Sequence, residues 1–338
     1  RAAARWEAIL QTPITVVIDV DFGPTFFGEP YEADTLGSTV PQLLGISNQY
    51  GVVRNIMISK AADARQAEVL TALPTTIINT DLGTTASMAA SSPILRALGV
   101  LSATADPDGE VEQIGEPPAI GFNSAFNYDF DSSDGIDPGK LDFEAIASHE
   151  IGHALGFSSF VGFKELSPTL PILPTPWDFF RFRPGTLTLS SVTSEKRLQL
   201  TGGDQVYFVG DSALGLSTGG PDNSGGDGQQ ASHWKDDGLT GQFVGIMDPN
   251  AGQGLREFAT AADLLALSYF GFKINPSSAV VELASVDDGS REDVIPLNNA
   301  MVVNRFSPSR FPSTLRAVRV QLPANADGSS AVGQQMRI

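Results

Sequence analysis

Residues 142–157 read Asp-Phe-Glu-Ala-Ile-Ala-Ser-His-Glu-Ile-Gly-His-Ala-Leu-Gly-Phe and contain two of the 3 histidines in this chain of 338 residues. Asp142 is typical of a residue that caps a helix N-terminus, and Gly156 is typical of one that ends a helix. The stretch therefore predicts a helix. His149 and His153 are four residues apart, so they lie one turn apart on the same face of that helix.

Glu150 lies between the two histidines in the sequence. His-Glu-x-x-His on a helix is a signature of zinc hydrolases, in which the two imidazoles bind the metal and the glutamate is the general base. The alternative is a pair of surface histidines on an amphipathic helix, a pattern that also arises by chance. Because the chain has so few histidines, we favour the metal site, with His149 and His153 as ligands and Glu150 as the catalytic base.

A catalytic zinc ion takes a third protein ligand and leaves one position open for water. His233 is the remaining histidine and is the simplest candidate, although it could instead be a surface residue beside Trp234. Glu165 and Glu195 are rival third ligands, because some zinc hydrolases use a glutamate. Such a glutamate usually comes from a following helix, and the proline-rich stretch after Gly156 offers none.

The amino-acid composition limits which class of protein and which kinds of partner are expected. The 41% hydrophobic and 18% charged content is ordinary for a globular protein, and the length allows a large core. A net charge of −18 argues against nucleic acid and against an anionic membrane surface as partners. No apolar run approaches the roughly 20 residues that span a bilayer. The absence of cysteine excludes disulfides and, together with many Gly, Ser, Thr, Asp and Asn residues, is typical of a secreted bacterial protein, so we expect an extracellular location.

Helix and strand patterns alternate before residue 142. Residues 14–20 form a nearly continuous β-branched run typical of a buried strand, and residues 119–123 indicate a second strand. Glycines and prolines indicate an irregular loop over residues 23–41. We expect helices at 2–10, at 50–59, at 64–73 with Asp63 as N-cap, and at 92–99 with Ser92 as N-cap. This alternation predicts an α/β or α+β unit with a sheet beneath the zinc helix.

The chain changes character after Gly156. Prolines, glycines, serines and threonines exclude long regular elements over much of 157–232, where short strands are expected at 186–189 and 205–209. Thr260 caps an expected helix at 260–269. We expect three parts: an N-terminal catalytic subdomain over 1–156, a C-terminal catalytic subdomain with the insertion over 157–275, and a small β-rich domain over 276–338 that could be truncated.

Two motifs together resemble those of a known clan of enzymes. The pattern His149-Glu150-x-x-His153-x-x-Gly156 is similar to the first eight positions of the metzincin zinc-protease motif, and Ile246-Met247-Asp248-Pro249 resembles the Met-turn of that clan. Most metzincins place the third histidine three residues after the glycine, where this chain has Ser159. In this respect the chain resembles the leishmanolysin-like branch, in which a long insertion precedes the third histidine.

The resemblance covers residues 1–275 and implies an α+β metzincin-like fold. It implies a secreted zinc endopeptidase that hydrolyses a protein or peptide substrate. The site residues that it implies are the zinc ligands His149, His153 and His233, the base Glu150 and the hydrophobic floor Met247. Many metzincins carry a tyrosine two positions after this methionine, and Pro249 stands there. The rival function is a non-catalytic binding or adhesion module on a metalloprotease-like scaffold, which would have no use for Glu150.

A second acidic segment, Asp129-Phe-Asp-Ser-Ser-Asp-Gly-Ile-Asp137, precedes the zinc helix. Its four carboxylates could bind Ca²⁺, which takes about six to eight oxygen ligands. The alternative is a solvated loop with Asp-Gly turn chemistry. We favour the loop, because position six of a calcium-hand loop should be glycine and is Asp134 here.

Overall fold

The computed structural model describes residues 1–105, 107–131, 135–211, 213–220 and 225–275. The chain divides into two units, and all described residues belong to the first, Arg1–Val281. This unit combines helices with several small sheets, which confirms the α+β class. The expected β-rich segment 276–338 lies outside the described residues, so the three-part division stays a prediction.

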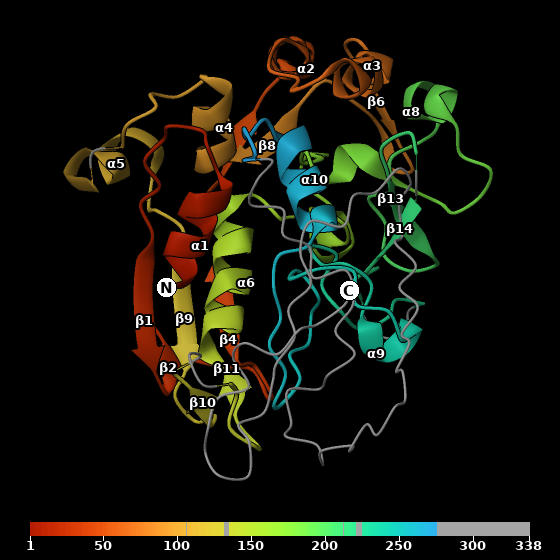
Figure 1. Cartoon of the computed structure of the whole chain (residues 1–338). Helices are drawn as coiled ribbons and strands as arrows, with labels where there is room; N and C mark the ends of the chain where they lie inside the picture. The colour runs from red at the N-terminus through yellow and green to blue at the C-terminus, as the bar shows by residue number, and fades with distance from the viewer. Residues whose placement is uncertain (106, 132–134, 212, 221–224, 276–338) are drawn as a thin grey trace, which may run out of the picture. The chain divides into compact units, whose positions relative to one another are not determined.

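A three-stranded sheet supports the predicted zinc helix. Its strand order is β1 (Asp19–Gly23), β9 (Ala119–Asn123) and β4 (Gly37–Val40), with β1 parallel and β4 antiparallel to β9. Helix α6 (Phe143–Leu155) packs against β4 and β9, and helix α1 (Ala2–Ile9) packs against α6, as Figure 1 shows. The buried side chains in this layer include Ile120, Phe122, Ile146, Ala147 and Ala154.

Local signals set both ends of α6. The Asp142 carboxylate accepts hydrogen bonds from the backbone N–H groups of Glu144 and Ala145 at 2.9 and 3.2 Å, as an N-cap does. Gly156 ends the helix at a φ of 138°, a conformation that side chains with a Cβ rarely adopt. A Cβ at Gly156 would also lie 2.4 Å from Ile94 Cδ1. The predicted helix start and stop are therefore confirmed.

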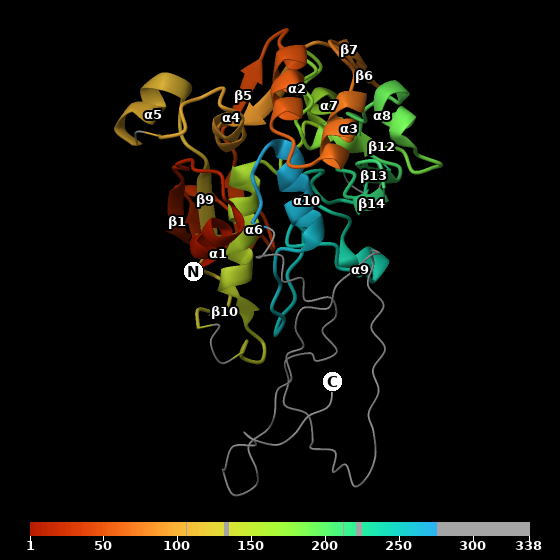
Figure 2. The same ribbon diagram turned by 45° about the horizontal axis from the view of Figure 1, so that its top comes forward.

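The second half of the unit is built around helix α10 (Ala261–Phe270) and an antiparallel sheet of β12 (Arg181–Phe182), β13 (Gln205–Phe208) and β14 (Ala213–Leu216). Figure 2 shows α10 between α6 and this sheet. Thr260 caps α10, as expected, and Gly271 ends it. Between residues 157 and 232 the longest described element is α8 (Leu189–Ser194), which agrees with the predicted lack of long elements.

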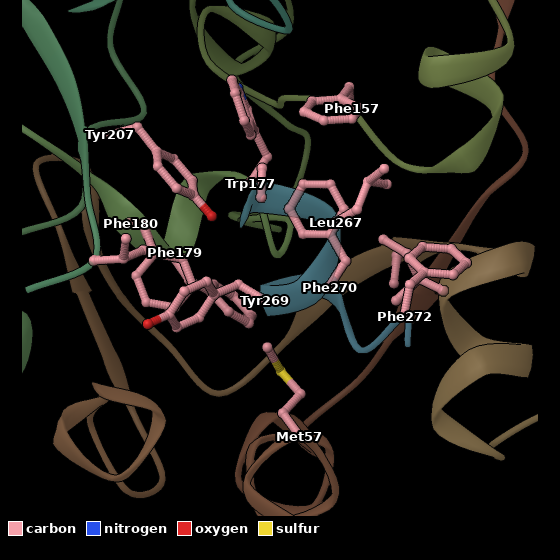
Figure 3. Close-up of a cluster of buried hydrophobic side chains, with 14 of the residues drawn as sticks. Met57, Phe157, Trp177, Phe179, Phe180, Tyr207, Leu267, Tyr269, Phe270 and Phe272 are labelled. Carbon is pink, nitrogen blue, oxygen red and sulfur yellow. The ribbon is translucent and has the colours of Figure 1, made fainter. Parts of the chain in front are cut away.

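One aromatic core joins the two halves. Trp177 packs against Tyr207 of β13, against Phe157 just after α6 and against Phe270 of α10 (Figure 3). All four side chains are fully buried. Aromatic side chains bury large areas, so this core contributes much of the free energy of folding. Buried side chains from residues 1–156 belong to the same cluster, so residues 1–156 and 157–275 share one core.

Shorter elements complete the described unit, and several match the expected ranges. Helices α2 (Tyr50–Ser59) and α3 (Ala64–Ala72) form where they were predicted, and Asp63 caps α3. Their neighbours are β5 (Leu43–Ile46), β6 (Ile78–Thr80), β7 (Gly83–Thr85), β8 (Met88–Ser91), α4 (Ser92–Leu98) and α5 (Pro107–Ile114). The remaining elements are β2 (Thr25–Phe26), β3 (Glu29–Pro30), β10 (Tyr128–Asp129), β11 (Leu141–Asp142), α7 (Phe163–Leu166), the 3₁₀ turn η1 (Asp178–Phe180) and α9 (Asp237–Thr240). Within the described ranges, no helix combines the length and apolar character that a bilayer crossing needs.

Four local predictions were wrong. The strand expected over 14–20 begins only at Asp19, where pairing with β9 starts. The loop expected over 23–41 contains β4, which the distant strand β9 holds in place. The segment 186–189, expected as a strand, instead leads into α8, because Thr188 is the N-cap of that helix and forms a capping box with Ser191. The N-cap of α4 is Ser91, one residue earlier than expected.

Candidate metal centre

Three imidazole nitrogens converge on one point. His149 and His153 project from the same face of α6, and His233 arrives from the segment that follows β14. The Nε2–Nε2 distances are 3.1 Å for His149–His153, 3.2 Å for His149–His233 and 3.0 Å for His153–His233. The structure therefore brings the three predicted ligands close enough together to hold one metal ion.

Backbone carbonyls fix the tautomer of each ring. His149 Nδ1 lies 2.7 Å from the Ile246 carbonyl oxygen, and His153 Nδ1 lies 2.7 Å from that of Phe157. His233 Nδ1 lies 3.0 Å from the Gln230 carbonyl oxygen. Because a carbonyl oxygen only accepts, each Nδ1 must carry the proton. Each Nε2 then presents a free lone pair to the shared point, as in a histidine metal ligand.

Burial keeps the three rings neutral. It lowers the pKa of His149 to about 4, and burial together with the neighbouring His149 lowers the pKa of His153 to about 3. The pKa of His233 falls well below its usual value for the same reasons. Three converging lone pairs repel one another unless a cation lies between them. Two nitrogens at about 2.0–2.1 Å from a tetrahedral metal ion lie about 3.3–3.4 Å apart, close to the observed 3.0–3.2 Å, so the three rings can hold one metal ion.

Glu150 is buried, follows His149 in α6 and is held by β4. Thr39 Oγ1 donates to Glu150 Oε2 at 2.6 Å, and a Cβ on Gly37 would lie 2.7 Å from Glu150 Oε1. Burial raises the pKa of Glu150 to about 7, while the hydrogen bond from Thr39 opposes that rise. The sequence predicts a loop over this segment and therefore does not indicate Gly37 and Thr39 as site residues. The Thr-Val pair at 39–40 was the available strand signal, but it is too short to stand alone.

Met247 is fully buried and packs closely against α6. A Cβ on Gly152, the residue before His153, would lie 2.4 Å from Met247 Sδ. The preceding residue, Ile246, supplies the carbonyl that orients His149. The turn that carries Met247 therefore lies against the histidine-bearing part of the helix. Direct contact between Met247 and the imidazoles stays a prediction.

We expect Gly152→Ala to destabilise the protein by about 1–3 kcal/mol through overpacking against Met247. Alanine gains about 1 kcal/mol in helix propensity over glycine, which offsets only part of that cost because Met247 is fully buried. Urea unfolding measures the difference. The double variant Gly152→Ala, Met247→Ala removes the clashing sulfur and should lose less stability than the two single changes added together. Strict additivity would show that this contact is not the cause.

Asp263 connects the segment that carries His233 to the turn that carries Met247. Its Oδ1 accepts from Trp234 Nε1 at 2.7 Å, and its Oδ2 accepts from the Ile246 N–H at 2.9 Å. Trp234 follows His233, so one fully buried carboxylate positions the segments around two of the histidines. Burial raises the pKa of this carboxyl. The Thr-x-x-Asp pattern at 260–263 predicts a helix cap, but the sequence does not indicate these long-range bonds.

The rival third ligands have other partners. The exposed Glu165 carboxylate accepts from Thr201 N–H and Oγ1 at 2.7 and 3.0 Å. Glu195 is the C-cap of α8 and lines a cavity of about 420 Å³ beside Arg183. Ser159 Oγ donates to Asp178 Oδ1 at 2.6 Å, inside the insertion. Neither glutamate belongs to the histidine group.

The acidic segment before α6 uses its carboxylates within the loop. Both oxygens of Asp129 accept backbone N–H groups, from Asp131 at 3.0 Å and from Asp137 at 2.8 Å. Asp131 also pairs with Arg1, and Asp137 pairs with Lys140. These contacts favour the turn interpretation over a calcium site. Residues 132–134 lie outside the described ranges, so the Ca²⁺ prediction stays untested.

The site thus brings three neutral imidazole nitrogens together, and the buried carboxylate of Glu150 follows His149 on the same helix. The five side chains that build it, His149, Glu150, His153, His233 and Thr39, come from a helix, a loop and an edge strand. Searches of protein-family models, curated proteins and solved structures find no match for the chain, so its function is inferred from this site.

Proposed function

We propose that the chain is a zinc-dependent endopeptidase with a metzincin-like arrangement of the leishmanolysin-like kind. The observation that carries the proposal is the convergence of three Nε2 atoms at 3.0–3.2 Å from two distant parts of the chain. The uncharged donor set keeps a bound Zn²⁺ site positive, which stabilises the oxyanion that forms during peptide hydrolysis.

The residues have separate roles in the proposed reaction. Zinc supplies Lewis-acid chemistry, which lowers the pKa of water and polarises a carbonyl group. Glu150 accepts a proton from the attacking water and donates it to the leaving amine, and a pKa near neutral suits both transfers. Thr39 holds the carboxylate through its 2.6 Å hydrogen bond. The three imidazoles bind the metal and leave the proton transfer to Glu150.

The position of β4 at a sheet edge favours a peptide as the substrate. In the described part of the chain β4 lies at one edge of the β1–β9–β4 sheet, and the β4 residue Thr39 contacts Glu150. An extended peptide that pairs with an exposed strand gains backbone hydrogen bonds. A peptide added beside β4 would lie next to the proposed base. This geometry suits cleavage within a chain.

The direct test combines metal analysis with digestion of casein by the purified full chain. We expect about one zinc per chain, casein cleavage, and loss of that cleavage with a chelator such as 1,10-phenanthroline. Added Zn²⁺ should restore it. Zinc-loaded protein that cleaves no peptide would contradict the proposal and favour the binding or adhesion module. Protein that takes up no zinc would contradict both the metal site and the peptidase.

We expect Thr39→Val to lower kcat/KM by about 10–100-fold, the range for losing a hydrogen bond to a charged group. Valine has nearly the same shape and suits a strand, so the fold should be kept. Zinc content should be unchanged, because Thr39 contacts Glu150 and not the histidines. Ser38→Ala on the same strand is the matched control. Full activity in Thr39→Val would show that Glu150 needs no such support.

A further inference from the structure

A buried ion pair lies in the insertion, outside the proposed site. Asp178 and Arg181 are both 0% exposed, and Arg181 Nε lies 3.4 Å from Asp178 Oδ1. Burial lowers the pKa of Arg181 to about 10, while Asp178 opposes that shift, so the guanidinium stays charged at neutral pH. A buried pair contributes little net stability, because removing two charges from water is costly. Its other partners therefore indicate what it does.

Arg181 holds the segment that carries His233. Its Nη2 donates to the Ala231 carbonyl oxygen, which also accepts from Trp177 Nε1 at 3.0 Å. Its Nη1 donates to the Ser217 carbonyl oxygen at 3.0 Å. The Ser217 N–H in turn donates to the carbonyl oxygen of His233 at 3.1 Å. The guanidinium thus anchors the backbone of His233 from both sides.

Asp178 holds the segment that leaves the zinc helix. Its Oδ1 accepts from Ser159 Oγ at 2.6 Å, and its Oδ2 accepts from the Phe160 N–H at 3.1 Å. These residues follow Phe157 closely, whose carbonyl oxygen orients His153. Arg181 therefore binds the segment that carries His233, and Asp178 binds the segment that begins at the carbonyl group orienting His153.

We propose that Asp178 and Arg181 are a positioning pair, which fixes His233 relative to His149 and His153 before the metal binds. The inference rests on the proposed metal site. Neutral lone pairs at 3.0–3.2 Å repel, so an outside structure must hold them together. The planar guanidinium reaches two carbonyl groups and a carboxylate at once, which a lysine ammonium does not. Holding the ligands in place reduces the entropy cost of metal binding.

The test measures metal affinity in Arg181→Lys by competition with a chromophoric zinc chelator. We expect zinc affinity to fall by about 10–100-fold, the range for partners that orient metal ligands. Substitution with Co²⁺ should give a visible spectrum different from that of the unchanged protein. Circular dichroism confirms that the variant is folded.

Arg54→Lys is the matched control. Arg54 is 6% exposed and donates to the carbonyl groups of Leu73 and Thr71, which lie outside the segments that position the histidines. We expect this variant to lose stability but to keep zinc affinity within about threefold. A merely structural role for Arg181 would make the two variants alike in zinc binding.

Ser159→Ala keeps the proposal testable if Arg181→Lys does not fold. It removes the hydrogen bond from Ser159 Oγ to Asp178 Oδ1, at 2.6 Å, and so loosens the segment that follows α6. We expect a smaller loss of zinc affinity, up to about tenfold. Unchanged affinity in Ser159→Ala and in any folded Arg181→Lys would overturn the positioning pair but leave the metal site intact. Failure of the unchanged protein to bind zinc would instead overturn the proposed function.

Discussion

Glu150→Gln is expected to lower peptidase activity by about 10²–10⁴-fold, the range for losing a general base. Glutamine has nearly the same shape and can still accept the hydrogen bond from Thr39, but its amide oxygen cannot take the water proton at neutral pH. Zinc should stay bound, because the three histidines are unchanged. The measurement is kcat/KM on a casein-type peptide, with zinc content determined on the same sample.

The matched control for Glu150→Gln is Glu144→Gln, which changes a carboxylate one turn or more from the histidines on the same helix. It should keep activity close to that of the unchanged protein. Substantial peptide cleavage by zinc-loaded Glu150→Gln would remove Glu150 from the mechanism.

His233→Ala is expected to abolish stoichiometric zinc binding after dialysis, and peptidase activity with it. Two imidazoles on one helix face would remain, and catalytic zinc sites use three protein ligands. No cysteine is present to replace the lost nitrogen. Atomic absorption on the dialysed protein gives the zinc content, and circular dichroism checks the fold.

Glu165→Gln is the control that separates His233 from the rival ligand. Its carboxylate is exposed and contacts Thr201, so zinc content and activity should be kept. A zinc-loaded, active His233→Ala would contradict the assignment of His233 and would favour a glutamate ligand.

Predictions from the sequence succeeded where the signals were local. Asp142 and Gly156 set the ends of α6, and Asp63 caps α3, because each makes its bonds within a few residues. The strand β4 was not predicted, because its partner β9 lies about 80 residues away. Its short β-branched pattern was also outweighed by the neighbouring glycines and prolines. Thr39 was missed for the same reason.

The site was predictable only in part. His233 could be proposed because it was the last histidine available, but the bonds that bring it to α6 come from Arg181, Ser217 and Asp263. These residues act through contacts between distant segments. Such contacts cannot be inferred from residue type and spacing. A single sequence therefore does not show which buried arginine or aspartate supports the metal centre.

The aromatic core places a constraint on the ancestry of the chain. Trp177, Phe179 and Tyr207 belong to the insertion, yet they fill the space around α10 and the end of the zinc helix. Removing this segment would open a large cavity at each lost ring. A shortened chain would keep a packed interior only if the core were rebuilt at the same time. The long route to His233 is therefore expected to persist among descendants of this protein, even where surface loops and substrate preference diverge.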